Sequence, residues 1–147
     1  MRVYCDPSAL VKLYIREKGS ADVIALFADG KNPVLLNELQ ELEIRNGIRQ
    51  KVLRADITES EAIAGLRLLD DDCIAETVVR KPVEWAAVYL RAEQLSRRFS
   101  MRQICRSFDL LHVAIAVVSD VGRFATADSE QAKLARDAGL KVIDFSR

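Results

Sequence analysis

Apolar residues recur along this chain with two different spacings, and the two alternate from one end to the other. Short continuous apolar runs are typical of buried strands, whereas apolar residues three and four positions apart are typical of helices. The pattern predicts strands over 3–5, 33–36, 73–79, 123–126 and 141–143, and helices over 7–18, 20–28, 37–53, 58–72, 82–99, 107–119 and 128–138.

Strands that alternate with helices predict the α/β class. The expected architecture is a central parallel sheet of about five strands with helices on both faces. The chain shows no linker, repeat or low-complexity segment, so residues 1–147 are expected to form one domain with a full hydrophobic core. Gly47 lies inside a predicted helix, where glycine costs about 1 kcal/mol, so close packing is expected there.

The charges cancel, because 22 Lys and Arg residues are matched by 22 Asp and Glu residues. No strong overall field therefore draws the chain toward nucleic acid or a membrane, and a polyanion has to be bound locally. Three cysteines without close spacing and a single histidine cannot build a typical zinc site. We expect buried thiols in a reducing cytoplasm, with neither a signal peptide nor a membrane span.

Four acids stand where parallel α/β sheets bind ligands, at or near the carboxyl ends of strands. Asp6 follows the first strand, Asp128 follows the fourth, and Asp109 opens the helix 107–119. Glu43 lies in the helix 37–53, which would have to lean over the same edge. Converging carboxylates repel each other by roughly 4 kcal/mol per close pair near a surface, so a divalent cation is the natural candidate to lie among them.

Three of these acids also have an interpretation that involves no chemistry. Asp6 before a proline is a good helix N-cap, and Asp109 would interact favourably with a helix dipole. Asp128, with Gln131 three residues on, resembles a capping box. Taken singly, each acid is better explained by capping, and only the joint pattern favours a site.

Other conspicuous residues have simpler explanations. The acidic run 70–72 is expected to be a solvated turn between a helix and a strand, at the wrong edge for catalysis. His112 lies on a very apolar helix, which favours a core histidine with a hydrogen bond. Trp85 and Tyr89, one helical turn apart, favour a core or subunit contact over a platform for base stacking.

Four segments in order resemble the acidic motifs of the PIN-domain family of metal-dependent ribonucleases, and especially its VapC-type toxins of prokaryotic toxin–antitoxin pairs. They are Asp6–Tyr14, Glu43–Asn46, Ser107–Ala116 and Phe124–Asp128, and residues 138–143 resemble the ending of the family. The resemblance covers almost the whole chain, and its third motif is the most specific. Glu43 is preferred over the nearby glutamates because Arg45 and Asn46 follow it.

The resemblance implies endonucleolytic hydrolysis of RNA with one or two Mg²⁺ ions, for which Mn²⁺ can substitute. Asp6 and Asp109 would be the main metal ligands, while Glu43 and Asp128 would hold metal-bound waters. The expected supporting residues are Ser8, Asn46 and Thr126, and the candidates for contact with RNA phosphates are Arg45, Arg102 and Arg106. The resemblance also implies a small antitoxin protein as partner and a homodimer.

Three other functions are alternatives to this one. A phosphatase with an aspartyl nucleophile normally needs a second acid two residues after Asp6, where Ser8 stands. A phospho-receiver module needs paired acids after the first strand. A catalytically silent PIN-like module that binds RNA or protein is the remaining alternative, and intact acids at all four positions argue against it.

Overall fold

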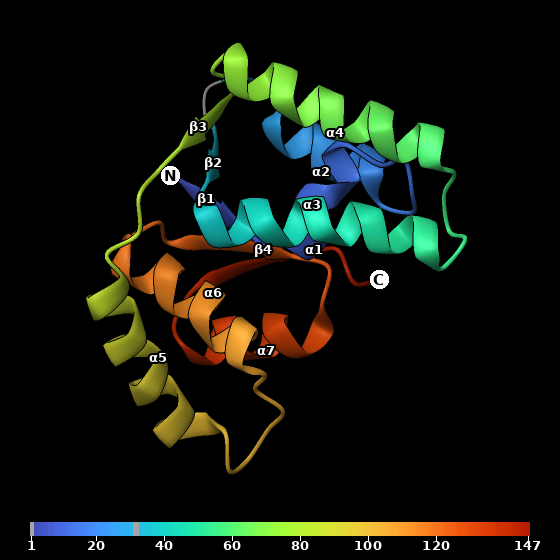
Figure 1. Ribbon diagram of the computed structural model, residues 1–147. Helices are drawn as coiled ribbons and strands as arrows, with labels where there is room; N and C mark the ends of the chain where they lie inside the picture. The colour runs from blue at the N-terminus through green and yellow to red at the C-terminus, as the bar shows by residue number, and fades with distance from the viewer. Residues whose placement is uncertain (1, 31–32) are drawn as a thin grey trace. The chain divides into compact units, whose positions relative to one another are not determined.

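The structure is a computed structural model that describes residues 2–30 and 33–147. The chain forms two compact units, which Figure 1 colours by residue number. The continuous unit is Pro7–Pro82. The discontinuous unit joins the start of the chain, up to Asp6, to Val83–Arg147.

The discontinuous unit contains a three-stranded parallel sheet in the order β1-β4-β5. Its strands are β1 (Val3–Cys5), β4 (Arg123–Thr126) and β5 (Lys141–Asp144). In the pairing of β1 with β4, Tyr4 lies opposite Phe124, and their rings stack with centroids 5.5 Å apart. Residues from both ends of the chain therefore share one core.

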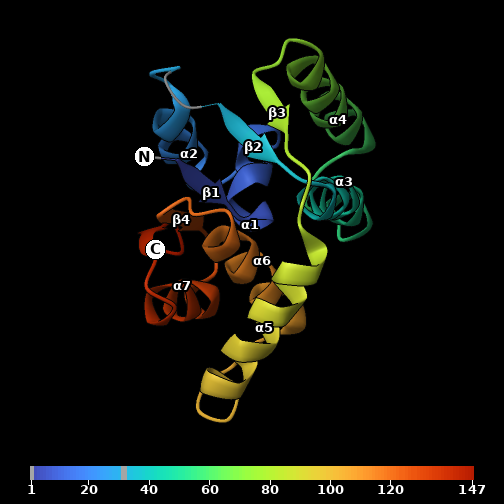
Figure 2. The same cartoon turned by 90° about the vertical axis from the view of Figure 1, so that its left-hand side faces the viewer.

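Three helices complete this unit: α5 (Trp85–Phe99), α6 (Ser107–Val118) and α7 (Ser129–Asp137). Helix α6 lies between α5 and α7, and both α6 and α7 pack against β4 (Figure 2). Residues 109–116 of α6 are all buried, as expected for a helix that is apolar on nearly every side. Within the described part of the chain, no helix has the length and apolar character needed to span a membrane.

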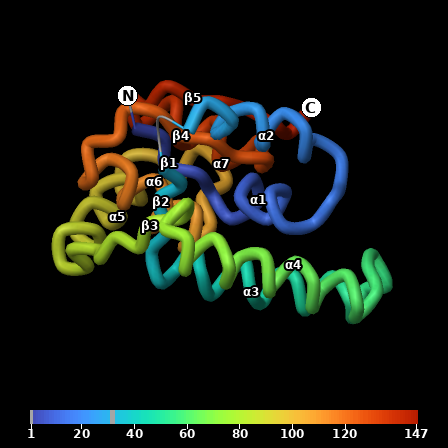
Figure 3. Tube along the Cα trace, turned by 90° about the horizontal axis from the view of Figure 1, so that it is seen from above, coloured from blue at the N-terminus to red at the C-terminus, as the bar shows by residue number. Residues whose placement is uncertain are grey.

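The continuous unit holds a second, two-stranded parallel sheet. Helices α3 and α4 form the crossover between its two strands and pack against each other (Figure 3). The elements of this unit are α1 (Pro7–Leu10), η1 (Val11–Leu13), α2 (Ser20–Phe27), β2 (Val34–Leu36), α3 (Glu38–Leu53), α4 (Glu59–Ile74) and β3 (Val78–Arg80).

Side chains that cap their own first turn define where the two long helices begin. The Asn37 side chain accepts from the Gln40 backbone N–H at 2.9 Å, and the Gln40 side chain accepts from the Asn37 N–H at 2.8 Å. Thr58 and Glu61 form the same reciprocal pair at the start of α4. The helix start predicted from the capping pattern at Thr58 is confirmed.

The α/β class and the parallel pairing are confirmed, but the strands divide differently from the prediction. The five strands of the described residues form a three-stranded and a two-stranded sheet rather than one sheet. The strand predicted over 73–79 is wrong in its start, because α4 continues to Ile74 and β3 covers Val78–Arg80. The helix predicted over 7–18 is shorter, and its last turn is η1, which ends at Leu13.

The acidic run 70–72 is not a turn but part of α4. Asp70 accepts a hydrogen bond from Arg45 of α3 at 2.6 Å, and Asp72 accepts one from the Tyr14 hydroxyl at 3.2 Å. These tertiary contacts offset the unfavourable interaction between negative side chains and the helix dipole near the C-terminus of α4. The interpretation as a solvated turn is therefore wrong.

The close packing predicted at Gly47 is also wrong, because a Cβ added there would meet nothing within 4 Å. Gly65 of α4 is the glycine with close neighbours. A Cβ at this position would lie 2.8 Å from the Tyr14 carbonyl oxygen and 2.8 Å from Ile15 Cδ1. Glycine at position 65 therefore permits α4 to approach the backbone of residues 14–15.

Candidate active site

Three of the four predicted acids lie together in the discontinuous unit. Asp6 directly follows β1, and its backbone N–H donates to the Ala125 carbonyl of β4 at 2.8 Å. Asp128 follows β4 and is the N-cap of α7, while Asp109 lies in the first turn of α6. Asp6 is 5% exposed and Asp109 is 9% exposed, so two of these carboxylates are buried. Both Asp6 and Asp128 occupy the carboxyl ends of parallel strands, as predicted.

Two side chains connect the three carboxylates. Gln131 Nε2 donates to Asp6 Oδ1 at 2.7 Å and to Asp109 Oδ1 at 3.3 Å. Arg106 Nε donates to Asp109 Oδ2 at 2.9 Å, and Arg106 Nη2 donates to Asp128 Oδ2 at 2.5 Å. Asp109 thus offers one oxygen to each donor and stands in the middle of the row. The three acids and the two side chains that join them are called the acidic row below: Asp6, Gln131, Asp109, Arg106 and Asp128.

Arg106 provides the positive charge of the acidic row. The hydrogen bond to Asp109, reinforced by the one to Asp128, raises the pKa of Arg106 above its usual value. Its side chain is 58% exposed, so the guanidinium lies at the solvent side of the buried acids. This exposed cationic side chain offsets the repulsion between Asp109 and Asp128.

Thr126 lies fully buried at the end of β4 and organises the start of α7. Its Oγ1 donates to Gln131 Oε1 at 2.6 Å and accepts from the Asp128 backbone N–H at 3.0 Å. Asp128 Oδ1 in turn accepts from the backbone N–H groups of Glu130 and Gln131. The capping role of Asp128 is confirmed, but the Gln131 side chain turns to the acids instead of completing a capping box.

Gln131 is the functional candidate that the sequence analysis missed. Its amide is 2% exposed, and a buried amide normally requires hydrogen-bond partners. A polar residue on the apolar face of the helix that follows Asp128 was the available signal. The capping-box pattern concealed it, because that pattern assigns the glutamine side chain to the helix end.

His112 is a buried residue of α6 beside Asp6. Its Nδ1 lies 2.7 Å from the Tyr4 hydroxyl, and its Nε2 lies 3.9 Å from Asp6 Oδ1. With 1% exposure, it confirms the prediction of a core histidine that makes a hydrogen bond. The ring packs behind the Asp6 carboxylate.

Four other predicted site residues lie in the continuous unit. Ser8 is on α1 and Glu43 is on α3, and both are half-buried, while Asn46 of α3 is exposed. Helices α1 and α3 pack against each other within this unit. Arg45, the fourth, takes part in the ion pairs considered next. Arg102, by contrast, lies exposed in the discontinuous unit, in the turn after α5.

Glu41 and Arg45 belong to a network of ion pairs in the continuous unit. Arg45 donates to Glu41 Oε1 at 3.0 Å and to Asp70 at 2.6 Å, and Arg80 of β3 donates to Glu41 at 2.9 and 3.0 Å. The hydrogen bond from Arg80, with that from Arg45, outweighs partial burial and lowers the pKa of Glu41. Glu41 therefore ties α3 to β3.

The acidic row suits a hard divalent cation in its chemistry. Among residues 2–30 and 33–147, no three Asp, Glu, His or Cys side chains surround one point closely enough to hold a metal. Mg²⁺ needs fewer, since it is usually bound through one or two carboxylates and completes its shell with water and phosphate. Asp6 and Asp109 already direct one oxygen each at the same Gln131 nitrogen. The donor set is all oxygen and fits Mg²⁺ or Mn²⁺.

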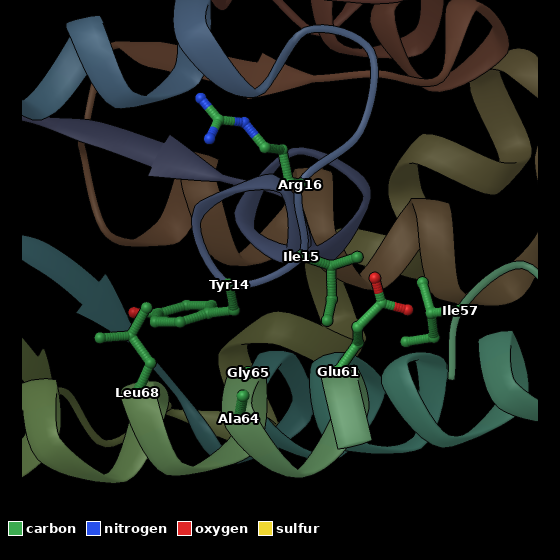
Figure 4. Close-up of a pocket in the computed structure, with 8 residues that line it drawn as sticks. All are labelled: Tyr14, Ile15, Arg16, Ile57, Glu61, Ala64, Gly65 and Leu68. Carbon is green, nitrogen blue, oxygen red and sulfur yellow. The ribbon is translucent and has the colours of Figure 1, made fainter. Parts of the chain in front are cut away.

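A pocket of about 250 Å³ lies elsewhere, in the continuous unit beside Gly65 (Figure 4). Tyr14 and Leu68 lie at one end of it, and Ile57 lies with Glu61 at the other. Glu61 is the one carboxylate among its eight lining residues. This pocket therefore offers a single carboxylate and none of the acids predicted from the sequence.

Known ribonucleases resemble the chain in sequence. It is 34% identical over 121 residues to Ribonuclease VapC45 of Mycobacterium tuberculosis strain CDC 1551 / Oshkosh and, to the same extent, to Ribonuclease VapC49 of strain ATCC 25618 / H37Rv. Each match covers 82% of this chain and 78% of the relative. This chain belongs to the VapC ribonuclease family. No protein-family model matches the VapC-family chain.

Solved structures share the fold of this VapC-family chain over nearly its whole length. VapBC2 from Rickettsia felis, bound to a DNA fragment from its promoter, has a TM-score of 0.68 at 14% identity and 98% coverage of both chains. FitAcB from Neisseria gonorrhoeae has a TM-score of 0.65 at 13% identity, covering 99% of both. VapBC-1 from nontypeable Haemophilus influenzae has a TM-score of 0.64 at 16% identity, covering 100% of both. At such identities the likeness establishes the fold.

Proposed function

We propose that this chain is an endoribonuclease that hydrolyses RNA phosphodiester bonds with Mg²⁺ or Mn²⁺. In this proposal it is the toxin of a VapBC-type toxin–antitoxin pair and acts in the cytoplasm. The observation that carries the proposal is the acidic row, in which two buried carboxylates and a partly exposed one come together from three parts of the chain. Membership of a family whose relatives are named ribonucleases supports the choice of RNA as substrate.

In this proposal, the three carboxylates have different roles, which follow from their exposure to solvent. Asp6 and Asp109, the buried pair, would hold the cation, and their burial in a low-dielectric setting strengthens that attraction. A cation bound there supplies the charge that lowers the pKa of a water and neutralises the attacked phosphate. Asp128 has a side chain 30% exposed, so it is placed to orient a water at the solvent side.

Other residues support the reaction in this proposal. Arg106 is exposed beside the acids and would meet an RNA phosphate when its guanidinium leaves the carboxylates. Thr126 holds the Asp128 backbone at the end of β4. Glu43 stays a prediction from the sequence motif, as do Ser8 and Asn46.

The proposal includes a protein partner. The solved structures with this fold include VapBC assemblies from Rickettsia felis and Haemophilus influenzae. We propose that this chain likewise pairs with a small antitoxin protein, and that it forms a homodimer. Free, antitoxin-depleted protein is therefore the form to test for activity.

The decisive experiment incubates the purified, partner-free protein with total RNA in Mg²⁺, in Mn²⁺ and in EDTA. Asp6→Asn should lower cleavage by about 100-fold or more while circular dichroism stays unchanged, because an amide replaces a metal-ligand carboxylate. Asp71→Asn is the matched control, since it neutralises an exposed acid of α4. It should cleave at the wild-type rate.

Two outcomes would contradict the proposal. A folded Asp6→Asn variant with full activity would remove Asp6 from the mechanism. Wild-type protein that binds RNA but cleaves none, with either metal, would instead favour the catalytically silent binding module.

A further inference from the structure

Gln131 presents a neutral amide at the centre of a cluster of charged groups. It lies on α7, yet its side chain contacts residues from three other elements: the ends of β1 and β4 and the first turn of α6. Its exposure is 2%, so each of these hydrogen bonds lies away from solvent. A buried amide is costly unless its polar atoms have partners, and here both ends of the amide have them.

The direction of the amide follows from its neighbours. Oε1 accepts from the Thr126 hydroxyl at 2.6 Å, and that hydroxyl oxygen accepts from the Asp128 backbone N–H. The hydroxyl thus receives the backbone hydrogen bond and donates its own proton to Gln131. The reverse orientation would place Oε1 against the carboxylates of Asp6 and Asp109, where acceptor would face acceptor. Thr126 thus fixes Nε2 toward the two acids.

The Nε2 atom of Gln131 therefore bridges the two buried carboxylates and keeps them close together. Nε2 donates to Asp6 Oδ1 at 2.7 Å and to Asp109 Oδ1 at 3.3 Å. The amide has no net charge, so it reduces the repulsion between the acids without repelling a cation as a lysine or arginine would. Its contacts resemble those of groups that orient metal ligands from behind.

We propose that Gln131 is a positioning residue that keeps the Asp6 and Asp109 carboxylates paired for a divalent cation. This inference rests on the proposed function, because it assumes that these two acids bind the metal. Gln131 acts through the acids and makes no contact with RNA in this role. Thr126 supports this role of Gln131, because its hydroxyl sets the orientation of the amide.

The test measures Mn²⁺ affinity by isothermal titration calorimetry on the full chain. Gln131→Met keeps the length of the side chain and removes both polar ends, so Mn²⁺ affinity should fall by about 10-fold to 100-fold. Gln40→Met is the matched control, since Gln40 is also a buried glutamine, with 1% exposure, in the first turn of α3. It should lower the melting temperature and leave Mn²⁺ affinity unchanged.

A second pair of variants keeps the test decisive if Gln131→Met does not fold. Thr126→Val removes the hydroxyl that orients the amide, so Mn²⁺ affinity should fall although Gln131 is intact. Thr126→Ser restores the hydroxyl and should recover most of the lost affinity. A role limited to packing would give no such recovery, because serine is smaller than threonine.

The outcomes separate this inference from the proposed function. Wild-type protein that binds Mn²⁺, together with folded Gln131→Met and Thr126→Val variants that bind it equally well, would overturn the inference alone. Wild-type protein that binds neither Mn²⁺ nor Mg²⁺ would remove the proposed function and this inference with it. Weaker binding in Gln131→Met and recovery in Thr126→Ser would support both.

Discussion

Arg106 places a positive charge where the proposed cation is needed. Its two donor nitrogens contact the carboxylates of Asp109 and Asp128, and the guanidinium is protonated at any physiological pH. A divalent cation and Arg106 therefore compete for the same negative charge. Metal binding would release the side chain toward solvent, where it can meet RNA.

We therefore predict that Arg106→Ala binds Mn²⁺ more tightly than the wild type, by roughly 5-fold, because an exposed ion pair contributes up to about 1 kcal/mol. The same change should lower the melting temperature in EDTA, since Asp109 and Asp128 lose the cation that bridges them. Calorimetric titration and thermal unfolding measure the two effects.

Arg97→Ala provides the control for Arg106→Ala, because Arg97 pairs with Glu93 on the exposed side of α5. It should leave Mn²⁺ affinity as it is. Weaker Mn²⁺ binding by Arg106→Ala would contradict the competition and show that Arg106 supports the metal site instead.

The sequence predicted the positions of the acids in the acidic row better than those of the side chains that contact them. The positions of Asp6 and Asp128 were predicted correctly, because acids that follow parallel strands lie at the same edge of the sheet. Gln131 was missed because its contact with Asp6 joins positions 125 residues apart in the chain, which no local pattern encodes. Contact of Arg106 with RNA remains a prediction. In this structure the Arg106 side chain contacts Asp109 and Asp128 instead.

At the scale of elements, helices α3 and α4 each contain one interior glycine, Gly47 and Gly65, and the two can be compared directly. Gly65→Ala should destabilise the protein by up to about 2 kcal/mol. The new methyl group would overlap the Tyr14 carbonyl and Ile15, at a cost of about 1–3 kcal/mol, because backbone cannot move aside cheaply. The gain in helix propensity, about 1 kcal/mol, offsets part of this cost. Urea unfolding followed by circular dichroism measures the change.

Gly47→Ala makes the same chemical change in α3 without the steric conflict. It should raise the free energy of unfolding by up to about 1 kcal/mol, because nothing lies within 4 Å of the added atom. Equal effects from the two alanines, in either direction, would mean that the approach of α4 to residues 14–15 is not what selects glycine at position 65.

The length of α4 shows why sequence patterns failed locally. Three successive aspartates followed by Cys73 and Ile74 resemble a helix end and the start of a strand. The helix continues because Arg45 and Tyr14, distant in sequence, bind two of those aspartates. Starts of helices were predicted well at Thr58, since a capping box is local, whereas this end depended on tertiary contacts.

At the scale of the whole molecule, acid stability depends on carboxylates such as Asp144 at the end of β5. Burial raises the pKa of Asp144, but hydrogen bonds from Ser146 and Arg136 outweigh it and lower the pKa to about 2. Since the unfolded pKa is 3.8, the ionised group stabilises the fold fully above about pH 5. That stabilisation is lost as the pH falls through about 2.

Asp144→Asn should therefore lower the free energy of unfolding near pH 7 by up to about 1 kcal/mol, as expected for a partly exposed ion pair. The difference from the wild type should stay constant above about pH 5 and narrow as the pH falls from about 4 to about 2. Urea unfolding across this pH range measures it. A difference that does not change with pH would mean that packing, rather than ionisation, is what the asparagine disturbs.

The pairing of β1 with β4 also means that the acidic row cannot form early in synthesis. The continuous unit leaves the ribosome as one uninterrupted stretch, whereas Asp6 must wait for a strand made more than one hundred residues later. A chain interrupted between residues 109 and 123 carries Asp6 and Asp109 but has neither β4 nor α7 to hold them. On the proposed function, unfinished copies would therefore be harmless to the cell that makes them, and cleavage would begin only with a complete polypeptide.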